Sequence, residues 1–188
     1  MSAQPQSDDG PEGLVYREEF ISAEEEQQLL SVLSSIDFRA VVMRGEAARR
    51  TVRHFGLDYD YESGELVPAD PVPASMHWLR DRCAEFMERD PADLVQILVS
   101  RYPAGAGIGW HRDAPMFGSR IAGVSLLAPC RMRFQRTVRG VRSAAELELA
   151  PRSAYLLTGK ARWSWQHSIP AAKALRYSVT FRTLKRAS

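Results

Sequence analysis

Two short segments in the C-terminal half of the chain contain residue types that bind metals and carboxylates. The first, residues 110–113 with sequence WHRD, places His111 and Asp113 two positions apart, and His167 follows 54 positions after the aspartate. Alternate side chains of a β-strand lie on one face, so His111 and Asp113 are expected to point the same way. Two imidazoles and one carboxylate are the ligand set that binds non-haem Fe(II) and leaves coordination positions open.

The second segment, residues 176–182 with sequence RYSVTFR, places Arg176 and Arg182 six positions apart, again on one strand face. A guanidinium group binds a carboxylate through two parallel hydrogen bonds, so two buried arginines suit a dicarboxylic acid. Each segment alone has an ordinary explanation, because H-x-D is common in strands and an arginine-rich last strand is usually a solvated edge. Together, within 72 residues, they predict an Fe(II) oxygenase with 2-oxoglutarate as its cosubstrate.

From residue 100 to residue 182 the chain resembles the AlkB family of Fe(II)/2-oxoglutarate dioxygenases, which remove alkyl groups from nucleobases. The matching motifs are RYP at 101–103 followed by Gly105, WHRD at 110–113, QHSIP at 166–170 and RYSVTFR at 176–182. A looser match extends upstream to Arg50 and to YDYESG at 59–64, which is similar to the nucleotide-recognition lid of the family. The arginine motif is the specific part, since the whole oxygenase superfamily shares the histidine and aspartate pattern.

The resemblance implies a role for the residues of both segments. His111, Asp113 and His167 would bind Fe(II), and Arg176 and Arg182 would bind the two carboxylates of 2-oxoglutarate. Both cofactors of the expected reaction would therefore lie on the C-terminal strands.

Three further residues would contact 2-oxoglutarate by the same resemblance. Tyr102 would donate its hydroxyl, and Ser100 and Ser178 stand where the best-known members carry asparagine. Serine is shorter and offers one hydroxyl instead of an amide, so we expect the affinity for 2-oxoglutarate to change but not its mode of binding. Pro115 stands where some members carry an acidic residue near the base, so the base preference does not carry over.

The resemblance also implies a nucleic-acid substrate. Tyr61 would stack on the alkylated base, Tyr59 would line the same face, and Arg50 would contact the substrate. Arginines at 49, 50 and 53, interleaved with aromatic residues, would hold the strand backbone. From the residues alone, a β-hairpin whose aromatics pack on the core is the more probable interpretation of segment 38–67.

The expected activity is oxidative dealkylation of bases such as 1-methyladenine and 3-methylcytosine in DNA or RNA. It would convert 2-oxoglutarate to succinate and CO₂ and release formaldehyde. An enzyme with the same cofactors that acts on a protein or a small molecule is the first alternative. An inactive β-helix domain that only binds a partner is the second, and the complete ligand set argues against it.

The expected fold is mostly β with flanking helices, a double-stranded β-helix or jelly roll within residues 94–184. A disordered tail at 1–13 precedes a single domain, 14–188, with a substrate-recognition lid at 38–67. Ser22 and Glu25 form a capping box for a helix that ends near Ser35. Other expected elements are a first strand at 14–20, a second helix at 74–88, and β-helix strands at 94–102, 108–113, 119–127, 131–136, 145–149, 153–157, 163–167 and 174–184.

Composition sets broad limits. The chain has 188 residues, of which 45% are hydrophobic and 26% charged, and its net charge is +2, as in an ordinary globular domain. Cys83 and Cys130 are expected to be buried thiols without a disulfide or zinc role. No basic start with an apolar segment and no apolar stretch of membrane-spanning length occurs, so we expect a cytoplasmic protein away from membranes. We also expect it to be a monomer.

Overall fold

The structure, a computed structural model, describes residues 10–43, 46–59 and 63–185. Its helical elements are α1 (Ala23–Ser34), a 3₁₀ turn (Ala74–Met76), α2 (His77–Phe86), a second 3₁₀ turn (Pro91–Asp93) and α3 (Gly159–Trp163). Its strands are β1 (Leu14–Arg17), β2 (Arg39–Met43), β3 (Glu46–Phe55), β4 (Leu57–Tyr59), β5 (Leu66–Pro68), β6 (Gln96–Tyr102), β7 (Ile108–His111), β8 (Phe117–Leu127), β9 (Cys130–Val138), β10 (Val141–Leu149), β11 (Ala154–Leu157), β12 (Gln166–Ile169) and β13 (Arg176–Leu184).

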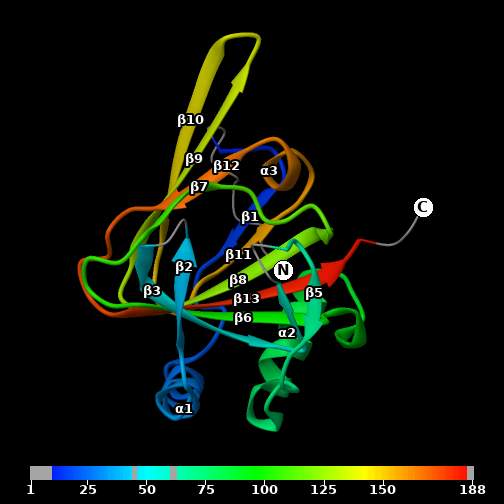
Figure 1. The fold of residues 1–188 in the computed structure, drawn as a ribbon, viewed down its shortest axis with the longest axis vertical. Helices are drawn as coiled ribbons and strands as arrows, with labels where there is room; N and C mark the ends of the chain where they lie inside the picture. Colours follow the sequence, from blue (N-terminus) through cyan, green and yellow to red (C-terminus); the bar gives the residue numbers. More distant parts are fainter. Residues whose placement is uncertain (1–9, 44–45, 60–62, 186–188) are drawn as a thin grey trace.

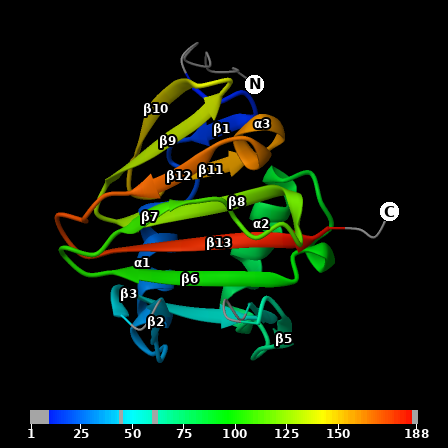
Figure 2. The same ribbon diagram turned by 45° about the horizontal axis from the view of Figure 1, so that its top comes forward.

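Two antiparallel sheets face each other (Figure 1 and Figure 2). The larger has the strand order β1-β11-β8-β13-β6-β3-β2, and the smaller has the order β10-β9-β12-β7. This arrangement confirms the predicted double-stranded β-helix. None of the helices in the described ranges is long and apolar enough to span a membrane.

The central strand of the larger sheet, β13, pairs with β6 on one side and β8 on the other. Arg176 lies opposite Tyr102, Ser178 opposite Ser100, and Arg182 opposite Gln96. Because cross-strand partners share a face, this register brings the predicted cosubstrate residues of two strands into one patch. A shift of one residue would turn all of them away from the cavity.

Helices α1 and α2 cover the outer face of the larger sheet (Figure 1). The predicted capping box is confirmed, since the Ser22 hydroxyl accepts a hydrogen bond from the Glu25 amide at 3.2 Å and Glu25 accepts one from the Ser22 amide at 2.8 Å. Arg82 of α2 donates two hydrogen bonds to the same Glu25 carboxylate, at 2.6 and 2.7 Å. A cap residue thus also joins the two helices.

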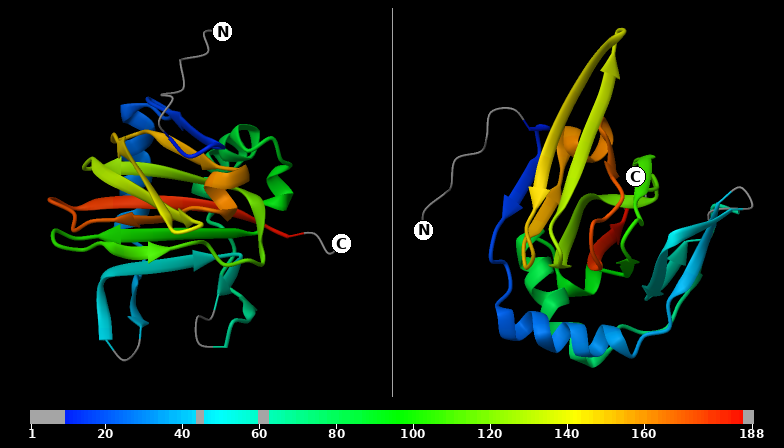
Figure 3. Two further views of the ribbon diagram at one scale, coloured as in Figure 1. Left: turned by 90° about the horizontal axis from the view of Figure 1, so that it is seen from above. Right: turned by 90° about the vertical axis from the view of Figure 1, so that its left-hand side faces the viewer.

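Segment 38–67, the expected lid, is partly integrated into the larger sheet. β3 pairs with β6, so half of the segment extends the larger sheet. Val41 and Val52 form a small core cluster with Leu98. Only β4 and β5 form a sheet of their own, and they project on one side of the molecule (Figure 3). The inner half of this segment therefore agrees with the hairpin interpretation.

Several predicted boundaries are wrong. The strands expected at 131–136 and 145–149 are one long hairpin, β9–β10, in which Val138 pairs with Val141. The strand expected at 163–167 begins only at Gln166, because residues 159–163 form α3. Trp163 therefore ends a helix instead of beginning a strand, and it is 38% exposed. The strand expected to reach residue 113 ends at His111.

Candidate active site

The three predicted metal ligands converge although two of them are far apart in sequence. His111 at the end of β7 lies directly opposite His167 of β12, and their ring centroids are 4.3 Å apart. Oδ2 of Asp113 lies 3.6 Å from Nε2 of His167. One ligand atom from each residue lies within 4.8 Å of the others, which is the only such cluster of three in the described ranges. These atoms suit the facial coordination of Fe(II) by two histidines and a carboxylate.

Asp113 lies in the turn after β7, and a buried arginine that sequence reasoning missed holds this turn. Nη1 of Arg162 donates to the carbonyl of Asp113 at 3.1 Å, and Nη2 donates to the carbonyls of Ala114 at 2.9 Å and Phe117 at 3.2 Å. Nε donates to the carbonyl of Gly118 at 3.1 Å. Since Arg162 is 2% exposed, it replaces water as the donor for four backbone carbonyls.

The carboxylate of Asp113 is held from the other side by Arg182. Two guanidinium nitrogens of Arg182 donate to Oδ1, one of them Nε at 2.8 Å, and Nη1 donates to Oε1 of Gln96 at 2.9 Å. Burial alone would raise the pKa of Asp113, but Arg182 and the two histidines outweigh it and hold this pKa below its usual range. The carboxylate is therefore ionised and turns Oδ2 toward the histidines.

Both histidines are neutral at pH 7. Burial lowers the pKa of His167 to about 3, with a further contribution from His111, and burial also lowers the pKa of His111. Nδ1 of His111 lies 2.8 Å from the carbonyl of Gly109, which fixes this nitrogen as the donor and leaves Nε2 for a ligand. Neutral imidazole is the form that coordinates a metal.

The hydrogen-bond partners of Arg176 show whether the cavity fits a carboxylate ligand such as 2-oxoglutarate. Its side chain is 1% exposed, and its guanidinium carbon lies 4.8 Å from the ring centre of Tyr102. Nη2 donates to Oγ of Ser125 at 3.1 Å, but Nε and Nη1 have no hydrogen-bond partner among the described residues. A buried cation with unpaired donors is costly unless an anion binds there, so the residues present fit a carboxylate ligand.

The structure separates the two arginines that the sequence treated as equivalent. Arg182 contacts the metal-binding carboxylate, whereas Arg176 has donors directed at no described acceptor. We infer that Arg176 binds the distal carboxylate of 2-oxoglutarate, while Arg182 holds Asp113 and borders the site of the other carboxylate.

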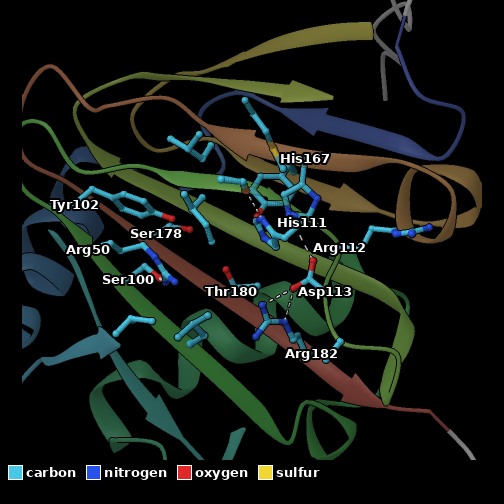
Figure 4. A pocket seen from close by; sticks show the side chains of 18 of the residues that line it. Arg50, Ser100, Tyr102, His111, Arg112, Asp113, His167, Ser178, Thr180 and Arg182 are labelled. Atoms are coloured by element: carbon cyan, nitrogen blue, oxygen red, sulfur yellow. Dashed lines mark hydrogen bonds and ion pairs between the residues drawn. The ribbon is translucent and has the colours of Figure 1, made fainter. Parts of the chain in front are cut away.

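Arg50 lies with the predicted cosubstrate residues. It is 5% exposed, donates from Nη1 to Oγ of Ser100 at 3.1 Å, and its guanidinium lies 6.0 Å from the ring centre of Tyr102. Figure 4 shows Arg50, Ser100, Tyr102 and Ser178 at one end of the cavity and the metal ligands at the other. Arg50 is expected from the resemblance to contact the nucleic-acid substrate, and strand alternation turns its side chain inward, beside the predicted cosubstrate residues.

Of the remaining residues of the expected lid, some line the cavity and others do not. Tyr59 lines the cavity, and its ring centre lies 6.2 Å from that of Phe117, edge to face. The ring of Phe117 in turn lies 4.9 Å below the Arg182 guanidinium, so Tyr59 belongs to the metal end. Tyr61 lies outside the described residues. Arg53 forms an ion pair with Asp70.

The cavity has a volume of about 330 Å³ and is bounded by both sheets. This volume is in the range of small-molecule binding sites. Tyr155 of β11 forms part of its wall opposite Gly123. A Cβ at position 123 would lie 2.4 Å from the Tyr155 ring, so the glycine is needed for this close approach.

Sequence reasoning missed three polar residues that support the site. Gln96 begins β6 directly before the apolar run ILV, Ser125 lies inside the apolar run IAGVSLL of β8, and they are 0% and 1% exposed. A polar residue beside or inside an apolar run of a strand signals a buried hydrogen bond and could have indicated both. Nothing in the sequence around Arg162 distinguishes it from a surface arginine.

The cysteines and the other histidine and tryptophan side chains near the site have ordinary environments. Cys83 is a buried free thiol as expected, whereas Cys130 is a free thiol that is only partly buried. Nδ1 of His54 lies 2.7 Å from Oδ1 of Asp58, a carboxylate partner that the sequence did not indicate. Trp110 is 36% exposed beneath the guanidinium of Arg133, at 5.2 Å from its ring centre.

Comparison with known proteins agrees with this geometry. A sequence profile of the 2OG-Fe(II) oxygenase superfamily matches residues 13–182, so the chain belongs to this superfamily. It is an Fe(II)- and 2-oxoglutarate-dependent dioxygenase. Within the superfamily it is AlkB-like, as its relatives show.

One relative is the "Alkylated DNA repair protein ALKBH8 homolog" of Arabidopsis thaliana, 30% identical over 184 residues that cover 86% of this chain and 51% of the relative. Another is the "tRNA (carboxymethyluridine(34)-5-O)-methyltransferase ALKBH8" of Mus musculus, 31% identical over 171 residues. That match covers 87% of this chain and 25% of the relative. The chain thus spans about half or a quarter of the length of these relatives.

Solved structures agree with the fold. "The structure of OsALKBH1" superposes with a TM-score of 0.67 at 16% identity, covering 93% of this chain and 97% of that chain. A prolyl hydroxylase from Trichoplax adhaerens, solved with a peptide fragment, superposes with a TM-score of 0.64 at 14% identity. It covers 92% of this chain and 84% of that chain.

Proposed function

We propose that the protein removes alkyl groups from nucleobases of DNA or RNA by oxidation. The observation that carries this proposal is the division of one cavity into two ends. Arg176 and Tyr102 lie at one end with donors suited to a carboxylate, and His111, Asp113 and His167 lie at the other. Tyr59 also lines the cavity near the metal end, and it comes from β4, which belongs to neither of the two large sheets.

When bound, Fe(II) and 2-oxoglutarate supply the oxidising chemistry, in which O₂ and 2-oxoglutarate yield succinate and CO₂ and one oxygen atom enters the alkyl C–H bond. An N-hydroxymethyl group formed in this way leaves as formaldehyde. The protein's own residues orient and enclose the reactants. Arg176, with Ser125 and Tyr102 beside it, binds the distal carboxylate, and Arg182 holds the Asp113 carboxylate in the orientation that the metal requires.

In this proposal Arg50 contributes to the binding of 2-oxoglutarate. Ser100 and Ser178 are shorter than the asparagines of the best-known AlkB proteins, which leaves fewer donors around the cosubstrate. The buried Arg50 guanidinium beside Ser100 supplies further donors at this end of the cavity. Base recognition is left to Tyr59 and Tyr61, with stacking of about 1–3 kcal/mol for each base–aromatic contact.

Succinate and formaldehyde release test the proposal. Matched RNA and DNA oligonucleotides with 1-methyladenine or 3-methylcytosine should stimulate both products over unmethylated oligonucleotides. The names of the relatives refer both to DNA repair and to tRNA, so both sugars are needed. If no methylated oligonucleotide stimulates turnover and a peptide or a free nucleotide does, the substrate assignment is wrong while the oxygenase chemistry stands.

A further inference from the structure

The β9–β10 hairpin is the most protruding part of the molecule and is strongly basic. It extends well beyond the two sheets (Figure 1 and Figure 3). Residues 130–149 contain five arginines and two glutamates, a net charge of +3. The whole chain has a net charge of +2, so the rest of the chain is close to neutral. The arginines are Arg131, Arg133, Arg136, Arg139 and Arg142.

The acidic residues neutralise only the half of the hairpin nearest the sheet. In the register, Glu148 lies opposite Arg131 and Glu146 opposite Arg133. Arg131 also forms an ion pair with Glu146 at 3.4 Å. The distal half, residues 135–143, contains three arginines and no acidic residue. Cross-strand ion pairing therefore accounts for the proximal arginines, whereas no acidic residue lies opposite the distal arginines in the hairpin register.

The tip of the hairpin is exposed to solvent. Val138 and Val141 pair across the strands and are 53% and 68% exposed. Arg139 and Gly140 connect them with φ of 49° and 79°, the left-handed conformation of a tight two-residue hairpin turn. The tip therefore presents two exposed valines beside the exposed Arg139.

The hairpin starts at the wall of the active site. Met132 of β9 and Leu149 of β10 line the cavity. Val138 lies six positions beyond Met132, so the tip lies about 20 Å further out at about 3.3 Å per residue. A partner held in the cavity and at the tip at once must extend over about this distance, which a flipped base with its neighbouring backbone does.

The chemistry of the distal half favours paired nucleic acid. Single strands are usually bound by aromatic side chains that stack on their bases, and residues 135–143 contain none. Arginine binds phosphate through its fork of donors, and a two-stranded β-ribbon can lie along a duplex. The exposed aromatic residue Trp110 instead borders the cavity, where an unpaired base would enter.

We propose that the distal half of the β9–β10 hairpin binds the phosphate backbone of a double-helical stem beside the base that enters the cavity. This inference rests on the proposed function, because the stem belongs to the nucleic acid that carries the modified base. Arg139 and Arg142 carry most of the contact, since both are exposed, and the two valines pack against the sugars of the stem.

Binding of labelled stem-loops tests the hairpin without any turnover. Fluorescence anisotropy would compare the wild type with Arg139→Gln/Arg142→Gln on an RNA stem-loop, a DNA stem-loop of the same sequence, and the loop sequence as a single strand. Loss of two phosphate contacts should weaken stem binding roughly tenfold near 0.15 M salt and reduce the slope of log K against log salt by about two. Binding of the single strand should be unchanged.

The control removes the same charge elsewhere. Arg17→Gln/Arg89→Gln changes two exposed arginines beside α2, because the Arg17 guanidinium lies 4.9 Å from the centre of the Phe86 ring and the Arg89 amide donates to the carbonyl of Ala84. Helix α2 lies at the end of the molecule opposite the hairpin (Figure 1), so this variant should leave stem binding unchanged. Equal stem binding by the hairpin variant and the wild type would overturn the inference, as would an equal loss for stem and single strand. Comparison of the two stem-loops shows whether the hairpin binds RNA or DNA.

The two proposals can fail separately. A wild type that binds stems through the hairpin but shows no base-dependent succinate release supports the inference and contradicts the proposed substrate. A protein that dealkylates a single-stranded oligonucleotide, with stem binding independent of Arg139 and Arg142, contradicts only the inference.

Discussion

Two regions of the cavity, the arginines of β13 and the aromatic mouth at Tyr59 beside the metal end, differ in how the fold holds their side chains. Arg176 and Arg182 lie on β13, which is hydrogen-bonded to a strand on each side, and they are 1% and 8% exposed. Tyr59 lies on β4, a strand of three residues that pairs only with β5 in the described ranges. The two arginines thus lie on the most constrained strand of the larger sheet, whereas the proposed base contact Tyr59 lies on a small separate sheet. Changes in substrate can accumulate there without disturbing the metal or cosubstrate.

The largest effect is expected at the metal. Asp113→Ala and His111→Ala should each abolish Fe(II)-dependent succinate release, because removal of one of three ligands leaves a poor iron site. The fold should persist, as circular dichroism can verify. Asp81→Ala, which removes an exposed carboxylate on α2, is the matched control. Turnover at the wild-type rate in either ligand variant would end the oxygenase assignment.

The next prediction separates the two arginines. Arg176→Gln should weaken 2-oxoglutarate binding by about 2–5 kcal/mol, because a buried carboxylate would lose its charged partner. Arg182→Gln should reduce metal affinity as well, since it also releases the carboxylate of Asp113. Calorimetric titration with a redox-inert divalent metal and with 2-oxoglutarate distinguishes the two losses. If both variants lose only cosubstrate affinity, and equally, the arginines have the equivalent roles that the sequence suggested.

A smaller loss is expected at Arg162, which supports the metal site without contacting it. Arg162→Met should lower metal affinity about 10- to 100-fold, as loss of an outer support usually does. The carbonyls of the Asp113 turn would lose their donor. The d–d spectrum of bound Co(II) should change with Arg162→Met and recover partly with Arg162→Lys. An unchanged spectrum with a lower melting temperature would mean that Arg162 stabilises only the fold.

The smallest effect is expected at the mouth. Tyr61→Ala and Tyr59→Ala should each slow repair of a methylated oligonucleotide by an amount equivalent to about 1–3 kcal/mol, the value of one stacked base. The uncoupled conversion of 2-oxoglutarate to succinate should survive, and Tyr61→Phe should be nearly silent. Repair by Tyr61→Ala at the wild-type rate would show that Tyr61 packs in the core. Loss of uncoupled turnover in Tyr59→Ala would show that the mouth and the metal end are not independent.

Sequence reasoning succeeded where local chemistry decides the outcome. The capping box at Ser22 and the strand character of 176–184 follow from short-range patterns, and the structure confirms both. It failed at the start of the strand expected at 163–167 and at the length of the β9–β10 hairpin. Side chains alternate between two faces only inside a strand, and α3 interrupts this alternation before His167. Polar alternation in 137–146 does not show whether two strands continue beyond the core.

The sequence by itself determined which chemistry is available: two histidines, one aspartate and two arginines, of types and in an order that suit iron and a dicarboxylate. Only the tertiary structure decided which atoms meet. Cross-strand pairing places His167 opposite His111, and Arg162 reaches the Asp113 turn from 49 residues away. It also separated Arg176 from Arg182 and turned Arg50 into the cavity. The reason is that burial and hydrogen-bond partners depend on packing between strands distant in sequence, which residue type and spacing do not contain.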